Sequence, residues 1–219
     1  MATATYTDTT RNLAEILEDL GGISPDRVRL KTPLGEATEA DLIELNERGN
    51  TLCELVDGML VEKGMSYTES GLTVVLLVFL RAFIAPRNLG LLTGADGMMR
   101  LVPGLVRVPD IAFAAWDRVP GRRWPTGAIA GFVPDLAVEV LSRSNTKAEM
   151  ARKRREYFQA GVRLVWEVDP SSRTVAVFDA PEQFVLLDAT GTLDGGAVLP
   201  GFALPLGELF SELDRQGNN

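Results

Sequence analysis

An acidic residue, Glu139, interrupts the apolar run of residues 136–141. A short continuous apolar run of this kind predicts a β-strand that is buried on both faces. An isolated buried carboxylate is costly, so Glu139 must be exposed, protonated, paired with a cation or bound to metal. Asp110 is similar, because apolar residues lie on both sides of it. Two acids in the cores of different strands are the oxygen ligands that Mg²⁺ prefers, so they predict a magnesium site.

A structural explanation competes with the metal site for each of these acids. Asp110 follows Pro109, which is also typical of a turn, and Glu139 is equally consistent with an ion pair to an Arg. Glu54 is a third acid in a predicted strand, and its position close to the turn-forming Asp57 is also consistent with a structural role. Spacing alone leaves these alternatives open.

A basic cluster follows Glu139 in the sequence, although the chain is acidic overall. Residues 145–160, which end before Gly161, predict a helix that carries Lys147, Arg152, Lys153, Arg154 and Arg155. Such a cluster is either a solvated helix face or a groove that holds phosphates beside the acids. Periodicity alone does not choose a catalytic cation among Lys147, Lys153 and Arg154.

The composition excludes several kinds of chemistry. The 219 residues include no His and one Cys, so a Ser-His-Asp triad, a Cys-His dyad, a His general base and a His-based zinc site are all absent. Cys53 has no partner for an internal disulfide, and the first ten residues lack the features of a secretory signal, so we expect a cytoplasmic protein. The net charge of −8 counts against nonspecific binding to nucleic acid.

The elements that must position these acids follow from the spacing of apolar residues and breakers. The central helix is predicted over residues 66–85, before Pro86. Its apolar stretch is too short to cross a membrane, so we expect no membrane partner. The unit of strand 136–141, helix 145–160 and strand 164–168 predicts a crossover with parallel strands. The other predicted strands are a hairpin over 52–61 with an Asp57-Gly58 turn, strands 91–96, 98–102 and 105–114, and a terminal meander over 174–179 and 184–188. Residues 116–134 are predicted as a loop and residues 206–213 as a closing helix. Two further helices are predicted near the N-terminus: the first is capped by Thr10 and ends at Gly21-Gly22, and the second is capped by Thr38 and ends at Gly49.

An ordered set of short motifs carries a resemblance to a known family. The set is Cys53-Glu54-Leu55-Val56-Asp57-Gly58-Met59-Leu60-Val61, Arg107-Val108-Pro109-Asp110-Ile111-Ala112-Phe113, Pro134-Asp135-Leu136-Ala137-Val138-Glu139-Val140-Leu141-Ser142, Lys153 to Tyr157, Ala160-Gly161-Val162 and Val168-Asp169-Pro170. In order and spacing it resembles the Uma-type restriction endonuclease family of the PD-(D/E)XK nuclease superfamily. The resemblance runs from about residue 40 to Leu199-Pro200-Gly201-Phe202 and Glu208-Leu209-Phe210.

The resemblance implies an α/β fold, with a restriction-endonuclease-like core in which helices flank a mixed β-sheet. We expect residues 1–37 to form an N-terminal helical extension and residues 38–219 a single nuclease domain that ends in a C-terminal β-meander. By resemblance, Asp110 and Glu139 are the metal-binding acids, and Glu54 matches an additional acid of the first hairpin. The superfamily's Lys position holds Leu141, so the matching cation is Lys153, with Tyr157 one turn later. The family's early His is also absent, and Glu69 or Ser70 lies in that neighbourhood.

These implications lead to a first hypothesis of an endonuclease that hydrolyses DNA phosphodiester bonds with Mg²⁺ or Mn²⁺. Asp110, Glu139 and Glu54 would hold the metal, Lys153 would orient water or stabilise charge, and Asp110→Ala should abolish turnover with little loss of fold. Because many nucleases of the superfamily dimerise, we expect a homodimer. The alternatives are a catalytically degenerate nuclease-like module that binds DNA or protein, and a hydrolase of small phosphoesters.

Overall fold

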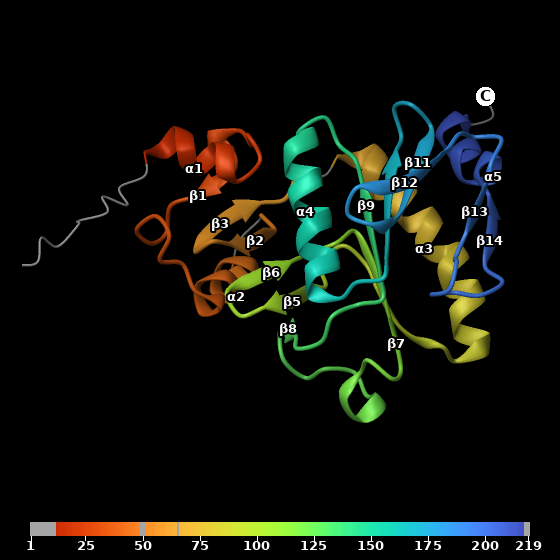
Figure 1. Ribbon diagram of the computed structural model, residues 1–219, viewed down its shortest axis with the longest axis horizontal. Helices are drawn as coiled ribbons and strands as arrows, with labels where there is room; N and C mark the ends of the chain where they lie inside the picture. Colours follow the sequence, from red (N-terminus) through yellow and green to blue (C-terminus); the bar gives the residue numbers. More distant parts are fainter. Residues whose placement is uncertain (1–11, 49–50, 65, 217–219) are drawn as a thin grey trace, which may run out of the picture.

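The computed structural model describes residues 12–48, 51–64 and 66–216, and in this part of the chain two six-stranded mixed sheets lie side by side (Figure 1). The first sheet has the order β1 (Val28–Arg29), β3 (Met59–Glu62), β2 (Cys53–Val56), β6 (Leu105–Arg107), β5 (Met98–Val102) and β8 (Ile129–Ala130). The second has the order β12 (Gln183–Leu187), β11 (Thr174–Ala180), β10 (Leu164–Asp169), β9 (Leu136–Val140), β7 (Ile111–Ala115) and β4 (Gly90–Thr93). A separate hairpin pairs β13 (Thr192–Asp194) with β14 (Ala203–Pro205). The α/β class with helix-flanked mixed sheets is therefore confirmed.

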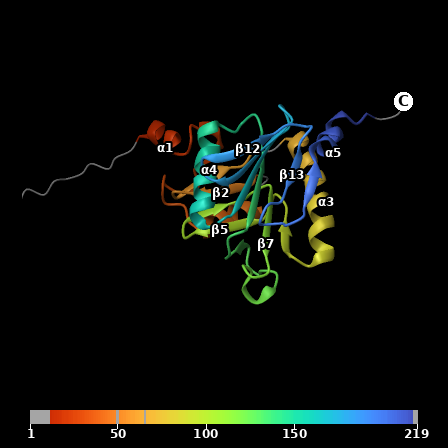
Figure 2. The same ribbon diagram turned by 45° about the vertical axis from the view of Figure 1, so that its right-hand side comes forward.

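The helices cover the sheets from two sides. They are α1 (Leu13–Asp19), α2 (Glu39–Arg48), α3 (Tyr67–Arg87), α4 (Lys147–Ala160) and α5 (Leu206–Ser211), with short 3₁₀ turns at Pro25–Arg27, Pro120–Arg122 and Glu212–Asp214. In Figure 2, α4 and α3 lie on opposite sides of the strands of the second sheet. One face of β9 packs against α3 through Val138, and the other face packs through Ala137 against Tyr157 of α4. Because side chains alternate along a strand, Glu139 faces α4.

The chain passes from the first sheet to the second at Asp110. The sequence predicted one strand over residues 105–114, and this is wrong, because β6 ends at Arg107 and β7 begins at Ile111 in the other sheet. Pro109 has no N–H and so cannot donate to a continuing ladder. Asp110 therefore lies just before a strand at the junction of the two sheets, rather than in a strand core.

The crossover unit that carries Glu139 is confirmed. β9 and β10 pair in parallel, with Glu139 opposite Glu167, and α4 connects them. The helix begins at a capping box in which Thr146 accepts a hydrogen bond from the Glu149 N–H. It ends at Gly161, whose φ of 101° is in the left-handed region that glycine adopts without strain.

The predicted hairpin and the predicted terminal meander are also present. The β2–β3 turn is formed by Asp57 and Gly58, which both have positive φ, and the meander of β10, β11 and β12 is antiparallel. The structure adds strands that were not predicted. These are β1, β8 within the predicted loop of residues 116–134, and the two strands of the β13–β14 hairpin before α5.

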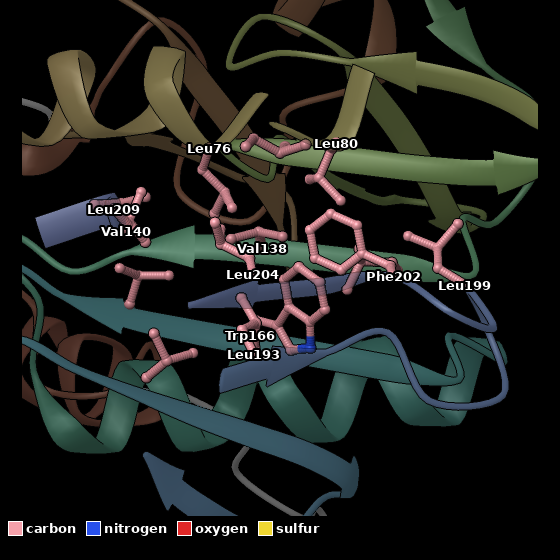
Figure 3. Close-up of a cluster of buried hydrophobic side chains, with 14 of the residues drawn as sticks. Leu76, Leu80, Val138, Val140, Trp166, Leu193, Leu199, Phe202, Leu204 and Leu209 are labelled. Atoms are coloured by element: carbon pink, nitrogen blue, oxygen red, sulfur yellow. The ribbon is translucent and has the colours of Figure 1, made fainter. Parts of the chain in front are cut away.

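The main core lies between α3 and the second sheet, where Trp166 stacks on Phe202 at a centroid distance of 5.9 Å (Figure 3). Leu76 and Leu80 of α3 are fully buried there. In the described part of the chain, α3 alone is long and apolar enough to meet a length-and-composition test for a membrane span, a test that core helices of soluble proteins also pass. The predicted end before Pro86 is wrong by two residues. A proline in the last turn removes little helical hydrogen bonding, and the helix ends at Asn88 in the left-handed conformation.

The N-terminal segment packs on the first sheet and on α4. Leu20 and Ile23 are buried against the β2–β3 hairpin, and β1 pairs with β3. Asn12, rather than the predicted Thr10, caps α1; Thr10 and the predicted stop Gly49 lie outside the described residues. Thr38 accepts a hydrogen bond from the Asp41 N–H at the start of α2, as predicted.

Gly21 is the point of closest approach between this segment and α4. A Cβ at Gly21 would lie 2.4 Å from the Cα of Glu149, whereas a Cβ at Gly22 would meet nothing within 4 Å, and both residues have positive φ. Gly22→Ala should therefore cost only the backbone strain of about 1–2 kcal/mol. Gly21→Ala should cost roughly 1–3 kcal/mol more, because α1 and α4 must separate. Urea denaturation of the two variants measures the difference, and equal free energies of unfolding would contradict this packing.

Candidate active site

Asp110 and Glu139 lie beside each other where β7 meets β9. The antiparallel register pairs Ile111 with Val138, so the next position of the ladder brings Asp110 opposite Glu139. The backbone N–H of Asp110 donates to Val138 O at 2.9 Å, and Val140 N–H donates to Asp110 Oδ2 at 2.6 Å. The two acids are 2% and 4% exposed. The structure therefore brings together the two predicted metal-binding acids.

The second oxygen of Asp110 faces a lysine that the sequence analysis missed. Lys63 Nζ lies 2.8 Å from Asp110 Oδ1, and it also donates to the backbone oxygen of Val108. No N–H or O–H group in the described part of the chain donates a well-oriented hydrogen bond to Oδ1. Alternation along β3 places residues 59, 61 and 63 on one face, which is the signal that could have identified Lys63.

This ion pair changes one expectation from the sequence. The prediction that Asp110→Ala leaves the fold almost intact treated Asp110 as unpaired. In the structure, removal of the carboxylate would leave the Lys63 ammonium buried without its counter-charge, and such an uncompensated charge is strongly destabilising.

Lys153 reaches the acids from α4, as the resemblance predicted. Its ammonium lies 3.2 Å from Glu54 Oε1 and 3.4 Å from Glu139 Oε1, and the side chain is 2% exposed. Tyr157, one turn later, donates its hydroxyl to Glu139 Oε1 at 2.6 Å. Glu139 is therefore held by two groups of the same helix face.

Glu54 is enclosed by donors. It accepts from Arg107 Nη1 at 2.7 Å, from Val108 N–H at 2.9 Å and from Lys153. Arg107 continues the network to Glu156. Within the described residues, no group of three or more His, Cys, Asp or Glu side chains is arranged to hold a metal ion. The geometry thus makes Glu54 an anchor for Arg107 and Lys153, and its predicted role as a metal ligand stays a prediction.

Burial and charge set the protonation states of this network. Burial raises the pKa of Glu54, but Lys153 and Arg107 outweigh that effect and hold it well below its usual range. Burial raises the pKa of Glu139 despite the attraction of Lys153. Burial lowers the pKa of Lys153, yet Glu139 and Glu54 raise it above its usual value, so the ammonium stays charged. The pKa of Tyr157 is raised by burial and by Glu139, so its hydroxyl keeps the proton that it donates.

The rest of the basic cluster on α4 is mostly engaged by acids. Arg152 pairs with Asp57 at 2.8 Å and Glu156 at 2.7 Å, and Arg154 pairs with Glu167 at 2.7 Å. Neither of these two guanidinium groups is free to form a phosphate-binding groove in this conformation. Among the three candidate cations that periodicity left open, Lys153 alone contacts the predicted acids.

Two comparisons with known proteins show what this chain is similar to. A family model named Uma2 and described as "Putative restriction endonuclease" matches residues 39–207. The crystal structure of "a putative nuclease belonging to DUF820" from Anabaena variabilis ATCC 29413 has a TM-score of 0.64 and 20% sequence identity, and the match covers 74% of this chain and 92% of that chain. At this identity the likeness shows a shared fold. No curated protein matches the chain.

The buried network leads to a stability prediction for Glu54. Glu54→Gln should destabilise the protein by about 3–5 kcal/mol at neutral pH, because Arg107 and Lys153 lose a shared buried carboxylate. The folded-state pKa of Glu54 is depressed, so its contribution is present above its ordinary value of 4.5 and is lost as the pH falls below that value. In urea denaturation, the difference between wild type and Glu54→Gln should shrink as the pH falls; a constant difference would contradict the depressed pKa.

Proposed function

This chain belongs to the Uma2 family of restriction-endonuclease-like proteins, and from that premise we propose that it is a metal-dependent endonuclease that hydrolyses phosphodiester bonds in DNA. The family and the structural neighbour point to nuclease chemistry in general. To this general nuclease chemistry the proposal adds two statements: that the reaction requires a metal ion and that its substrate is DNA.

The observation that carries the proposal is the pair of buried acids, Asp110 and Glu139, each of which faces a lysine ammonium. Asp110 Oδ2 accepts from Val140 N–H, whereas Oδ1 has the Lys63 ammonium at 2.8 Å and no well-oriented hydrogen bond in the described part of the chain. Two buried carboxylates side by side repel each other unless a cation lies between them. Mg²⁺ binds in proteins through one or two carboxylates and otherwise keeps its waters, so Asp110 and Glu139 fit such an ion. A divalent cation supplies Lewis acidity toward the phosphate and lowers the pKa of bound water.

The chain's own residues have separate tasks in this proposal. Lys153 keeps a positive charge beside Glu139, where it orients the attacking water or stabilises charge that develops on the phosphate. Tyr157 fixes the orientation of the Glu139 carboxylate through its hydrogen bond. Lys63 neutralises the charge of Asp110. It also offers a second ammonium group near the acids, and by resemblance the position of the superfamily's Lys is occupied here by Leu141.

Access to the acids requires a local opening. Asp110 and Glu139 are almost inaccessible to water in this conformation, so a DNA phosphate reaches them only when neighbouring groups move. The connection from β9 to α4 lies next to Glu139 and carries the exposed Arg143, and α4 begins with the exposed Lys147. These cations line a cleft of about 450 Å³ together with Ser142, Glu167 and Asp169. Since Glu167 is paired with Arg154, Arg143 and Lys147 supply local positive charge for a polyanion that the net charge of −8 does not.

The test uses variants that keep the shape of each side chain; Asp110→Asn, like Asp110→Ala, leaves Lys63 without its counter-charge, and this is controlled for below. We expect Asp110→Asn and Glu139→Gln each to remove Mn²⁺ binding in calorimetry and to reduce metal-dependent DNA cleavage by roughly 100-fold or more. Glu167→Gln is the matched control, since Glu167 is opposite Glu139 in the sheet but pairs with Arg154. The control should keep metal binding and cleavage.

A second variant separates loss of function from loss of fold. Lys63→Met/Asp110→Asn removes both members of the buried pair and leaves no uncompensated charge, so it should unfold at a higher urea concentration than Asp110→Asn if the latter is destabilised. Folded Glu139→Gln protein that still binds Mn²⁺ as wild type does would overturn the metal site. Metal binding without turnover on DNA would favour the noncatalytic module.

A further inference from the structure

The outer strand of the second sheet exposes an uninterrupted row of large apolar side chains. β12 is the last strand of that sheet and pairs with β11 alone among the described strands. Phe184, Val185 and Leu186 are 56%, 62% and 60% exposed. No described helix or loop covers them, so β12 presents both a free backbone edge and free apolar side chains.

Edge strands of soluble proteins normally carry features that prevent pairing with another strand. Lysines, prolines, bulges or an inward-pointing charge on the strand are the usual ones. The β12 sequence Gln183–Leu187 has no Lys, no Pro and no charged residue. The nearest charges, Glu182 and Asp188, lie just outside it. The N–H and C=O groups along its outer edge are therefore available to another strand.

Both faces beside this edge are hollowed. On one face a cleft of about 620 Å³ is lined in part by Val177, Val185 and Leu187. On the other face, the cleft of about 450 Å³ beside α4 is lined in part by Phe178 and Phe184, whose rings are 5.0 Å apart. The side chains of a strand alternate between the two faces of a sheet, so a strand added at the β12 edge would place side chains beside both clefts.

We propose that β12 of a second copy of this chain occupies this edge, in an antiparallel pairing with a two-fold axis at Val185. This axis sets Val185 opposite Val185 of the second copy and Phe184 opposite Leu186 of the second copy, so apolar side chains meet on both faces. A two-fold contact requires that one surface be complementary to itself. The three consecutive apolar side chains of β12, centred on Val185, meet that requirement. The two six-stranded sheets then join into one continuous sheet.

The charges at the ends of β12 work against this register. Glu182 falls opposite Asp188 of the second copy, and Arg155, 3.8 Å from Glu182, weakens the repulsion between these two acids. The other exposed apolar surface, on α3, differs in kind. Val74 and Val78 are each 59% exposed there, but a helix has no free backbone groups with which to extend a sheet.

The test measures the mass of the full chain by sedimentation equilibrium at micromolar concentrations. Wild type should have twice the monomer mass of 23.8 kDa. Val185→Lys and Val185→Glu each place like charges opposite each other at the axis and should weaken the dimer by roughly 100-fold or more. An equimolar mixture of the two variants pairs Lys with Glu and should restore the dimer. Val74→Lys, at an equally exposed position on α3, is the control and should leave the mass unchanged.

Three results would overturn the proposal. These are a monomeric wild type, a dimer that survives both Val185 variants, and a dimer that Val74→Lys dissociates. Circular dichroism melts of each variant establish that it is folded. A Val185→Cys variant gives an independent check of the register, since mild oxidation should cross-link it to a dimer while wild type, whose Cys53 is buried, stays uncross-linked.

Discussion

The structure depends on the burial of two carboxylates next to each other. Asp110 and Glu139 are adjacent because β7 pairs with β9, and this pairing removes both from water. A buried charge is tolerated when a cation and hydrogen bonds compensate it. The chain supplies those cations from elements that are distant in sequence, Lys63 after β3 and Lys153 on α4. The first sheet, the second sheet and α4 are thus held together at one ionic cluster.

The same cluster relates stability to chemistry. In the proposed metal-bound state, a divalent cation would have to share the two acids with the ammonium groups that neutralise them or displace those groups, so affinity for metal would depend partly on how readily Lys63 leaves Asp110. Glu54 does not compete in this exchange, because Arg107 and Val108 already use its oxygens. The edge proposed for assembly, β12, is three strands away from β9 in the second sheet, and its Phe184 lines the same cleft as Arg143 and Lys147.

Sequence reasoning identified the crossover, the hairpin over 52–61, the terminal meander and the two acids that the structure brings together, because each leaves a local signal. An acid in an apolar run, a positive-φ Asp57-Gly58 turn and a glycine after a helix are visible in a few neighbouring residues. The prediction of strands was wrong where the pairing of distant segments, rather than the neighbouring residues, decides the structure. Residues 105–114 have the hydrophobicity of a single strand, and Pro109 alone does not show that the two halves enter different sheets.

By itself, the sequence determined which chemistry is available: without His and with a single buried Cys53, carboxylates, lysines and a tyrosine remain. It also determined the order of motifs that identifies the family. Only the tertiary structure decided which ions meet, because Lys63 and Asp110 are 47 positions apart by their numbers and come together solely through the packing of two sheets. It also decided that Lys153 is buried and Lys147 exposed, since the face of α4 that points inward is set by the strands beneath it.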